Sequence, residues 1–442
     1  MKLTQNNTDF INGFRASSPY IHAHRGSTFV LLIPGKLIKD SLFSHIIHDI
    51  ALLTSLGIRL VLVHGARTQI DNNLDKANVK TSYHQGLRIT DDQVLSSVKD
   101  AVGHIRVEFE ALLSQGLINT PMSGASIRVS SGNYVVAKPL GIVDGIDFRH
   151  TGQVRRVDLK GIHSRLDGGD VVLLSPIGYS PSGDIFNLDA EALACNVACE
   201  LQAEKLLLLV DQQHLSNNPH QQLLRELTVA QGQEILGQNY LNDNAAKHLR
   251  TAIRACESGV LRSHLINAEQ DGALLLELFS RDGCGTLVTS KSYDHLRPAL
   301  AEDASGILEL ISPLIASGAL LERSRESLEI EISDYYVLER DGMIIGCAAL
   351  HQFGIKKEAA ELACLAVHPQ YCRQGHGNSL LNHIKNIAKN IGIKKIFALT
   401  TLSEHWFIEQ GFIETDIETL PIEKKQFYNL QRKSKIFCKH IV

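Results

Sequence analysis

The stretch Cys372-Arg373-Gln374-Gly375-His376-Gly377-Asn378-Ser379-Leu380-Leu381, CRQGHGNSLL, places two glycines two positions apart, directly before an apolar helical pattern. A strand-like run, ELACLAV (361–367), precedes it. Leucine and isoleucine recur downstream at helical spacing, which predicts a helix that begins at about residues 375–378. The first turn of a helix has unpaired N–H groups and the positive end of the helix dipole, and glycine leaves these groups accessible. The stretch therefore predicts an anion-binding loop.

The bulk properties indicate a globular chain with more than one domain. With 442 residues it is longer than a single core usually supports, so we expect two or three domains. The net charge is −4, and nothing indicates a nucleic-acid or membrane surface. No apolar run reaches the roughly 20 residues of a membrane helix, and MKLTQNNTDF (1–10) lacks a signal-peptide core. We therefore expect a cytoplasmic protein.

Cysteine and histidine patterns indicate neither a disulfide framework nor a metal site. The eight cysteines include no C-x-x-C pair, which favours free thiols in a reducing compartment. The twenty histidines show neither H-E-x-x-H nor zinc-finger spacing. No metal cofactor is expected.

The first block, residues 1–290, alternates continuous apolar runs with amphipathic helical patterns. The apolar runs include TFVLLI (28–33), IRLVLVHG (58–65), DVVLLSPIG (170–178) and KLLLLVD (205–211). Such runs are typical of strands buried on both faces, and helices between them favour parallel pairing. The block is predicted to be a three-layer αβα domain with a mainly parallel sheet.

The remaining sequence divides into a linker and a second domain. Residues 291–306 are charged, contain Pro298 and show no strong periodicity, so we expect a hinge. Residues 307–442 begin with two helical patterns, and the pair Asp341-Gly342 then predicts a hairpin turn. A strand at 360–367, the glycine loop, a helix, the strand IKKIFALTT (393–401) and a short helix follow. This order predicts an α+β module.

The order of elements around the glycine loop resembles the GNAT acetyltransferases. That family binds the pyrophosphate of acetyl-CoA on the backbone amides of a Q/R-x-x-G-x-G/A loop, which Gly375 and Gly377 match. The first motif position is Cys372, so one polar contact is missing or is supplied by Arg373. Arg373 and His376 would add charge at the rim. The resemblance assigns coenzyme binding to the strand before the loop and to the loop itself: Cys364, Leu365, Ala366, Arg373, Gln374, Gly375, His376, Gly377 and Asn378.

The reaction implied by this resemblance is direct attack of an amine on the thioester. An amine is mostly protonated near pH 7, so a base must remove a proton, directly or through water. Glu361 is the candidate, because it is the one carboxylate on an otherwise apolar strand, although a solvent-facing edge residue fits the same pattern. The tyrosine that often protonates the thiolate in this family corresponds to Phe407, so no general acid is assigned.

The whole chain resembles the bacterial N-acetylglutamate synthases, in which an amino-acid-kinase-like domain precedes a GNAT domain. The stretches that carry this resemblance are LGIRLVLVHGAR (56–67), NTPMSGASIRVSSGNYVVAKPLG (119–141), GALLLELFSRDGCGT (272–286), LERSRESLE (321–329), HWFIEQGF (405–412) and YNLQRKSKI (428–436). The resemblance implies that acetyl-CoA and L-glutamate give N-acetyl-L-glutamate and CoA, the first step of arginine biosynthesis.

Two basic clusters within the predicted module flank a candidate cleft. Glutamate carries two carboxylates, so its pocket needs at least two forked cations. The clusters offer four candidates: Arg323, Arg325, Arg432 and Lys433. Arg323 and Arg432 match the family best, although solvated surface charge is an alternative for any one of them. At the end of IFALTT, backbone and hydroxyl groups would face the substrate amine: those of Leu399 and Thr400, or Ser403 as an alternative.

The first block lacks residues that amino-acid kinases use. These kinases hold ATP phosphates with a lysine in a K-x-G-G motif, which here reads Leu32-Ile33-Pro34-Gly35. Proline has no N–H to donate, and a second kinase lysine falls on His248. Lys36 does not complete a P-loop, because the first glycine of that motif is Val30. A transferring phosphoryl group would be poorly neutralised, so kinase activity is not expected.

A kinase-like domain that keeps its sheet but lacks the catalytic residues of a kinase suggests a regulatory role. In arginine-sensitive kinases of this type, an N-terminal helix and a segment resembling AIRACESGVLRSHLI (252–266) form an arginine site and help to build hexamers. The resemblance therefore implies feedback inhibition by arginine and a homo-hexamer. The candidate arginine site is Glu257, Ser258 and Gly259, although Glu257 also fits an exposed helix end.

Three other functions stay open at this point. An arginine-binding regulator with a degenerate GNAT module is favoured by Cys372 and Phe407, and is opposed by Glu361, Arg432 and the loop glycines. A bifunctional synthase-kinase is opposed by the altered K-x-G-G motif. An acetyltransferase for a protein lysine is opposed by the paired basic clusters, which suit a small dicarboxylate.

Overall fold

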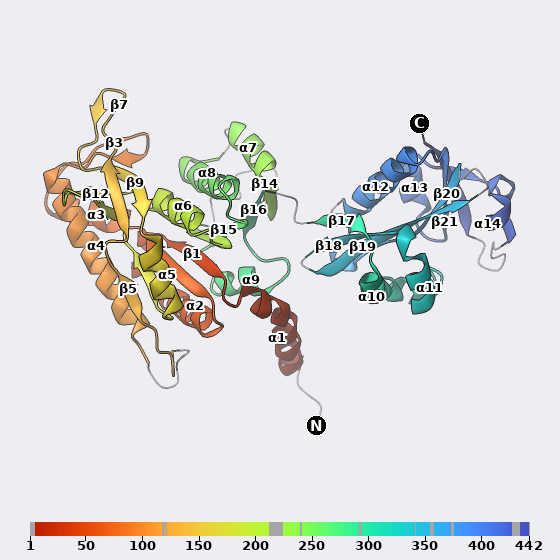
Figure 1. Ribbon diagram of the computed structural model, residues 1–442, viewed down its shortest axis with the longest axis horizontal. Coiled ribbons are helices and arrows are strands. Elements are labelled where there is room, and N and C mark those ends of the chain that lie inside the picture. Colours follow the sequence, from red (N-terminus) through yellow and green to blue (C-terminus); the bar gives the residue numbers. More distant parts are fainter. Residues whose placement is uncertain are drawn as a thin grey trace. The chain divides into compact units, whose positions relative to one another are not determined.

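In the computed structural model, the chain divides between Ser292 and Tyr293 into two units (Figure 1). The residues that it describes are 5–116, 120, 122–211, 224–238, 241–290, 294–340, 342–353, 358–372, 375–426 and 434–441. Four residues that the sequence assigns to a site lie outside these ranges: Arg373, Gln374, Arg432 and Lys433. Within the described ranges, no helix has the length and apolarity needed to cross a membrane.

An eight-stranded sheet forms the centre of the N-terminal unit, in the order β14-β16-β15-β13-β1-β2-β10-β5. Neighbouring strands pair in parallel, except that β15 and β16 are antiparallel. In chain order they are β1 (Thr28–Ile33), β2 (Arg59–His64), β5 (Val129–Ser131), β10 (Val171–Leu174), β13 (Lys205–Val210), β14 (Glu226–Thr228), β15 (Arg262–Asn267) and β16 (Thr286–Thr289). Every residue of β1, β10 and β13 is buried, which explains their largely apolar sequences. The predicted mainly parallel sheet is confirmed.

Helices cover both faces of this sheet, because successive strand residues point to opposite sides. Phe29 and Leu31 of β1 belong to one apolar core, and Val30 and Leu32 belong to the other. The first core includes residues of α2 (Phe43–Ser55), α3 (Arg67–Lys76), α4 (Asp92–Leu113) and α9 (Ala273–Phe279). The second is covered by α5 (Leu159–Asp167), α6 (Ala190–Glu200), α7 (Val229–Gly237) and α8 (Asp243–Glu257). The unit therefore has the three predicted layers.

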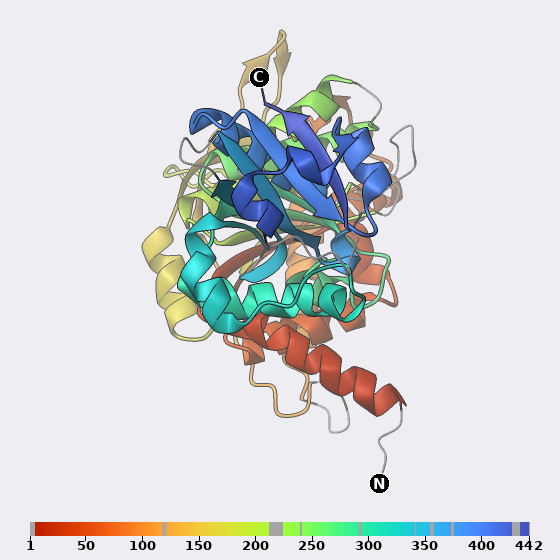
Figure 2. The same cartoon turned by 90° about the vertical axis from the view of Figure 1, so that its right-hand side faces the viewer.

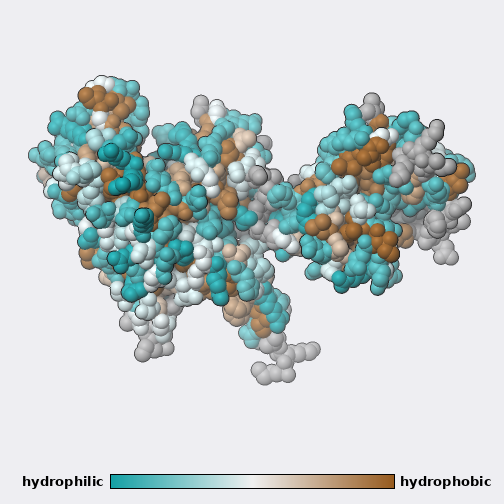
Figure 3. All heavy atoms as spheres, in the orientation of Figure 1, coloured by the Kyte–Doolittle hydropathy of each residue, from teal (hydrophilic) through white to brown (hydrophobic). Residues whose placement is uncertain are grey.

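Smaller elements complete the N-terminal unit. A second sheet, in the order β12-β11-β6-β9, contains β6 (Val135–Pro139), β9 (Gly152–Val157), β11 (Ile177–Tyr179) and β12 (Ile185–Asn187). Two hairpins pair β3 (Tyr83–His84) with β4 (Leu87–Arg88), and β7 (Ile142–Val143) with β8 (Ile146–Asp147). The 3-10 helix η1 (Gly35–Lys39) follows β1. Helix α1 (Gln5–His24) projects from this unit and exposes Phe10 and Phe14, and apolar spheres are visible on it in Figure 3.

A seven-stranded sheet forms the C-terminal unit, in the order β17-β18-β19-β20-β21-β23-β22. The strands are β17 (His295–Pro298), β18 (Tyr335–Arg340), β19 (Met343–Phe353), β20 (Ala359–Val367), β21 (Lys395–Thr400), β22 (Ile413–Thr415) and β23 (Lys435–His440). All neighbours are antiparallel except β20 and β21, which are parallel. Strand β19 directly follows β18, as the Asp341-Gly342 pair predicts.

Helices lie on both faces of the C-terminal sheet, which Figure 2 shows from the side of this unit. One face carries α10 (Ala304–Ala316) and α11 (Arg325–Glu331). The other carries α12 (His376–Asn390) and α13 (Glu404–Glu409). The remaining short helices are η3 (Ala301–Asp303), η4 (Ile332–Asp334), η5 (Pro369–Tyr371), η6 (Ile417–Thr419) and α14 (Ile422–Gln426). The predicted α+β class of this domain is confirmed.

The segment predicted as a linker, 291–306, is not irregular throughout. Residues 295–298 form β17 and pair with β18, and α10 begins at Ala304. The guanidinium of Arg297 donates to both carboxylate oxygens of Asp303, at 2.6 and 3.0 Å. Most of the segment therefore belongs to the C-terminal unit. An edge strand of four residues is too short to show periodicity, and Pro298 is tolerated there because edge strands need fewer N–H donors.

Candidate active site

Strands β20 and β21 start as neighbours and then separate. Their parallel pairing runs from Ala359 with Lys395 to Leu362 with Ala398 and ends there. Strand β20 continues to Val367 and stays paired with β19 on its other side. Beyond Leu362, one edge of β20 therefore presents backbone groups that no strand of the described residues covers.

A β-bulge reshapes β20 in this separated region. The pairing register shifts between Cys347 and Ala349, opposite Cys364. Cys364 has a φ of 52°, in the left-handed region that residues other than glycine rarely adopt. The Cys347 thiol donates to the Cys364 carbonyl at 3.3 Å, which helps to hold the bulge. Strained backbone of this kind is concentrated at functional sites.

A cavity of about 730 Å³ lies at the separated strands. Its wall combines residues of β20 and β21, the start of α12 and the loop before α11. The predicted site residues that line it are Arg323, Glu361, Cys364, Leu365, Gly375, Gly377, Asn378, Leu399, Thr400 and Ser403. Folding therefore brings most of the described candidate residues together from distant positions in the sequence.

The start of α12 supplies backbone donors to this cavity. Gly375 is the N-cap residue, with a φ of 88°, and as a glycine it has no side chain that could cap the first turn. Such a φ favours glycine, and a Cβ at Gly375 would have open space around it, so the backbone approach is unobstructed. Gly377 faces Trp406, whose ring would lie 3.5 Å from an added Cβ. A 15-residue helix with a glycine as its N-cap residue and a second glycine in its first turn is suited to an anion such as a pyrophosphate.

His376 does not supply the rim charge that the sequence suggests. Its ring is buried, is absent from the cavity wall, and has Nδ1 3.3 Å from Oδ2 of Asp294. Burial lowers the pKa of His376 and Arg340 lowers it further, against the opposing effect of Asp294. The imidazole is therefore mainly neutral near pH 7. The position of His376 between two glycines in the sequence did not indicate which way its side chain points.

Glu361 forms a buried ion pair. Its side chain is 9% exposed, and Oε2 lies 2.6 Å from Nζ of Lys424, which also lines the cavity. The alternative of a solvent-facing edge residue is therefore wrong. Lys424 belongs to α14, far from β20 in sequence, and the run IEKKQ gives no pattern that identifies it as a site residue.

Arg323 is held in the cavity wall by two contacts. Its Nη1 lies 3.1 Å from Oε2 of Glu331, and its guanidinium lies 5.8 Å from the ring centroid of Tyr335. Glu331 also lies 3.9 Å from Nε2 of His351, which pairs across the strands with Glu361. The guanidinium is thus oriented while it still faces the cavity. Arg325, by contrast, is largely exposed and pairs with Glu329 on its own helix, as a solvated charge would.

The far end of the cavity contains hydroxyl and aromatic groups. Thr400 accepts from the backbone N–H groups of Leu402 and Ser403 through its Oγ1, at 3.3 and 3.0 Å. Phe407 is buried, and its ring stacks with Phe437 at 5.9 Å, so no phenol stands at this position. Ser434, which the sequence analysis did not identify, also lines the cavity.

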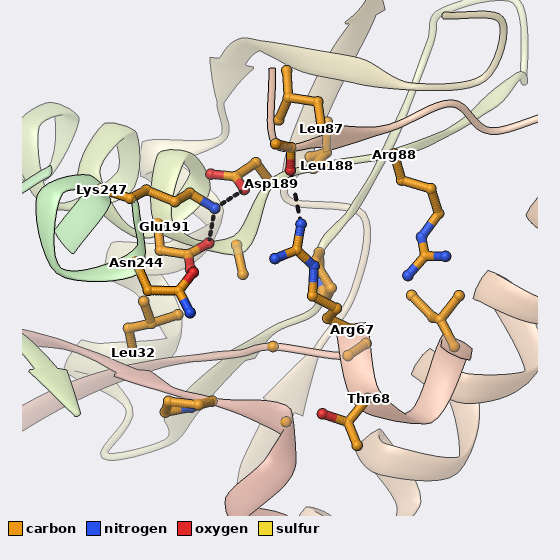
Figure 4. Close-up of a pocket in the computed structure, with 18 of the residues that line it drawn as sticks. Leu32, Arg67, Thr68, Leu87, Arg88, Leu188, Asp189, Glu191, Asn244 and Lys247 are labelled. Carbon is orange, nitrogen blue, oxygen red and sulfur yellow. Dashed lines mark hydrogen bonds and ion pairs between the residues drawn. The ribbon is translucent and has the colours of Figure 1, made fainter. Parts of the chain in front are cut away.

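A second cavity, of about 310 Å³, lies in the N-terminal unit (Figure 4). Leu32 and Pro34 line it, as the altered kinase motif predicts for the end of β1. Lys247, next to His248, also faces it and forms ion pairs with Asp189 and with Glu191, the latter at 2.9 Å. Burial alone would lower the pKa of Lys247, but the two carboxylates raise it. The cavity therefore retains a cation that the sequence analysis did not count.

The three residues suggested for an arginine site lie at the C-terminal end of α8. Glu257, Ser258 and Gly259 are exposed, and Glu257 accepts from Nε2 of Gln233 at 2.6 Å. None of them lines either of the two cavities. Among the described residues, no cluster of three or more His, Cys, Asp or Glu side chains is arranged to hold a metal ion.

Comparison with known proteins gives a consistent family for both units. Residues 27–267 match the amino acid kinase family, and residues 308–412 match the acetyltransferase (GNAT) family. The chain is 48% identical over 432 residues to an amino-acid acetyltransferase of Pseudomonas fluorescens SBW25, with 98% of this chain and 99% of that protein covered. It is 49% identical over 434 residues to an amino-acid acetyltransferase of Azotobacter vinelandii, with 98% and 99% covered.

Solved structures agree with these relatives. The N-acetylglutamate synthase of Neisseria gonorrhoeae, complexed with coenzyme A and L-arginine, is similar over 98% of this chain and 99% of its own. The identity is 37% and the TM-score is 0.87. The same enzyme complexed with coenzyme A and N-acetyl-glutamate gives a TM-score of 0.63 over the same coverage.

Proposed function

The chain belongs to the amino-acid acetyltransferase family, and we propose that it acetylates the α-amino group of L-glutamate. It is an acyltransferase with acetyl-CoA as its cosubstrate. The choice of site rests on one cavity that combines a helix start with a glycine N-cap, an oriented guanidinium and a buried carboxylate. The product would be N-acetyl-L-glutamate, which places the reaction at the start of arginine biosynthesis.

In this proposal, backbone groups hold the coenzyme. The N–H groups at the start of α12 bind the pyrophosphate, where the helix dipole adds to their hydrogen bonds. The pantetheine arm pairs with the uncovered edge of β20 at Cys364, Leu365 and Ala366, as an added strand would. Only main-chain atoms of Cys364 are needed, so its thiol has no role as a nucleophile. Arg373 and Gln374 would contribute from the loop.

The amino group attacks the thioester carbonyl directly. Glu361 takes a proton from the ammonium, directly or through a water molecule, so that the free amine attacks. Lys424 fixes the direction of this carboxylate through their 2.6 Å ion pair. The carbon–nitrogen bond forms and the carbon–sulfur bond breaks. The departing CoA thiolate takes up the second proton that the nitrogen loses. Thr400 and the backbone near Leu399 or Ser403 orient the amine.

The carboxylates of glutamate would bind guanidinium groups. Arg323 is already oriented by Glu331 and Tyr335, which lowers the entropy lost on binding. Arg432 and Lys433 are proposed for the second carboxylate. Arg325 is the weakest of the four candidates, because it is exposed and paired with Glu329.

The N-terminal domain is proposed to be regulatory. Leu32 and Pro34 in its cavity support a loss of kinase activity, because the phosphoryl oxygens would lack a lysine and a backbone donor there. Feedback inhibition by arginine is supported by family resemblance and by the arginine bound to the gonococcal enzyme. Assembly into a homo-hexamer is supported by family resemblance alone. The eight free thiols, all among the described residues, support a cytoplasmic location.

A thiol-release assay tests this function. The purified chain is given acetyl-CoA and each of a panel of amino acids, with and without arginine. We expect CoA release with L-glutamate that is at least about tenfold faster than with aspartate or glutamine, because aspartate is one methylene shorter and glutamine lacks the second carboxylate. Arginine should lower the initial rate with glutamate. Equal release with all the amino acids would contradict the substrate, and an unchanged rate with arginine would contradict the regulatory role.

A further inference from the structure

Asp294 is the second residue of the C-terminal unit and contacts the first turn of α12. Its Oδ1 accepts from Nε of Arg340 at 2.6 Å, and its Oδ2 lies 3.3 Å from Nδ1 of His376. The side chains of all three residues are at most 16% exposed. The carboxylate of Asp294 thus links the chain just after the domain boundary to His376, which lies between the two loop glycines.

The same group of residues holds the other end of the glycine loop. The guanidinium of Arg340 lies 5.2 Å from the ring centroid of Tyr371, which is buried and lines the coenzyme-sized cavity. The rings of Tyr371 and His376 meet edge to face at 6.1 Å. Asp294 and Arg340 therefore contact residues on both sides of the loop that carries Gly375.

The charges of Asp294 and Arg340 explain why the contact between Asp294 and His376 is stable. Arg340 compensates the carboxylate of Asp294, and the lowered pKa of His376 leaves a neutral imidazole that can donate its Nδ1–H to that carboxylate. A charge-assisted hydrogen bond at 2.6 Å between poorly exposed groups is short and directional. The first turn of α12 is thus held by Asp294, which directly precedes β17, while its glycine N-cap has no side chain.

We propose that Asp294 is a positioning residue of the coenzyme site, which fixes the backbone donors at Gly375 and Gly377 through His376 and through Arg340 with Tyr371. This inference rests on the proposed placement of the coenzyme pyrophosphate at the start of α12. It also makes the coenzyme loop depend on the conformation of the chain directly after the boundary between the two units.

The test compares Asp294→Asn with Asp303→Asn. Asp303 is a matched control, because its buried carboxylate also pairs with an arginine. That arginine is Arg297 of β17, and Asp303 is bonded to it and to the Leu300 backbone instead of α12. Loss of one charge-assisted bond should raise the KM for acetyl-CoA about tenfold in Asp294→Asn. Its KM for glutamate and its kcat should stay within about twofold. Asp303→Asn should keep all three values within about twofold.

Direct binding gives a readout that does not depend on turnover. The chain contains one tryptophan, Trp406, and it lines the cavity beside Gly377. Titration with CoA, followed by the fluorescence of Trp406, should give a Kd about tenfold higher in Asp294→Asn than in Asp303→Asn. Circular dichroism checks that each variant is folded. If Asp294→Asn does not fold, Arg340→Lys, which keeps the charge but loses the planar contact with Tyr371, replaces it with the same expected increase.

Two results would overturn the inference. One is an equal Kd for CoA in the Asp294 and Asp303 variants. The other is an Asp294 variant in which the KM values of both substrates rise together. The variant Gly375→Val tests the coenzyme placement separately from the role of Asp294. If Gly375→Val and Asp294→Asn both bind CoA normally, the pyrophosphate is not at this loop. If Gly375→Val loses CoA while Asp294→Asn does not, only the role of Asp294 is wrong.

Discussion

The two cavities of this protein contain similar residue types but differ in how their cations are neutralised. In the N-terminal cavity, Lys247 is shared by two carboxylates and Lys36 pairs with Asp211. In the C-terminal cavity, Lys424 pairs with Glu361, Arg323 has only one carboxylate partner among the described residues, and α12 has a glycine as its N-cap residue. A cation that is already neutralised gains little from a ligand anion, whereas a helix start with a glycine N-cap still offers donors.

This difference indicates where anionic substrates are handled. The N-terminal cavity lies at the ends of parallel strands, and its lysines and Arg88 pair with carboxylates, whereas Arg67 donates to the Gly86 carbonyl. The C-terminal cavity leaves its donors available at the point where two strands separate. The acetyl transfer proposed for this protein therefore belongs to the C-terminal domain, and four substitutions test the comparison.

The largest effect is expected for Glu361→Gln. Without the proposed base, the ammonium of the substrate is not deprotonated, so kcat should fall by about 100- to 10,000-fold. The KM for acetyl-CoA should stay nearly constant. Steady-state kinetics of CoA release gives both values. Glu358→Gln is the control, because Glu358 lies just before the same strand but pairs with Lys394 at the surface. A kcat for Glu361→Gln close to that of the control would rule out the base.

Gly375→Val should come next. A β-branched residue at a φ of 88° is strained, and its side chain would stand where the pyrophosphate approaches. We expect the KM for acetyl-CoA to rise about 100-fold, which corresponds to roughly 2.7 kcal/mol. Gly392→Val is the control at the opposite end of α12, because Gly392 has a φ of 83° and equally open surroundings. The coenzyme placement fails if both variants change the KM for acetyl-CoA equally.

Arg323→Ala should weaken the use of glutamate. Loss of one charge-assisted contact to a carboxylate is expected to raise the KM for glutamate about 10- to 30-fold, with the KM for acetyl-CoA nearly unchanged. Arg325→Ala, two residues away and mainly exposed, should change neither value by more than about twofold. A similar response of the two variants would show that the 321–329 cluster is only surface charge.

Lys247→Met should have the smallest effect on catalysis. It leaves two poorly exposed carboxylates without their ammonium, so the unfolding free energy of the N-terminal unit should fall by about 2–3 kcal/mol. Acetyl transfer, measured below the melting temperature, should stay within about twofold. Differential scanning calorimetry measures the first quantity. A loss of acetyl transfer without a loss of stability would contradict the structural role assigned to this lysine.

Local patterns in the sequence predicted the fold class and much of the candidate site. Continuous apolar runs between helices are sufficient to indicate a parallel sheet, because strands buried on both faces tolerate few polar residues. Gly375 and Gly377 were recognised because a loop and the start of a helix are contiguous in sequence. Glu361 was recognised because a single carboxylate in an apolar strand is unusual.

Other features could not be predicted because their partners are remote. Lys424 reaches Glu361 from a short helix 63 residues later, and neither residue alone indicates the pair. The sequence placed Asp294 in a hinge, yet it contacts His376 and Arg340. His376 was expected at the rim, but the direction of its ring depends on Asp294 and on burial.

The order of residues alone thus determined which elements form, since helix starts, turns and buried strands depend on neighbours within a few positions. Tertiary structure decided which charges stay available to a ligand. Whether Lys247, Arg323 or His376 faces a carboxylate of the protein depends on side chains that folding brings within about 4 Å, and electrostatic interactions at that distance decide which groups remain free to bind.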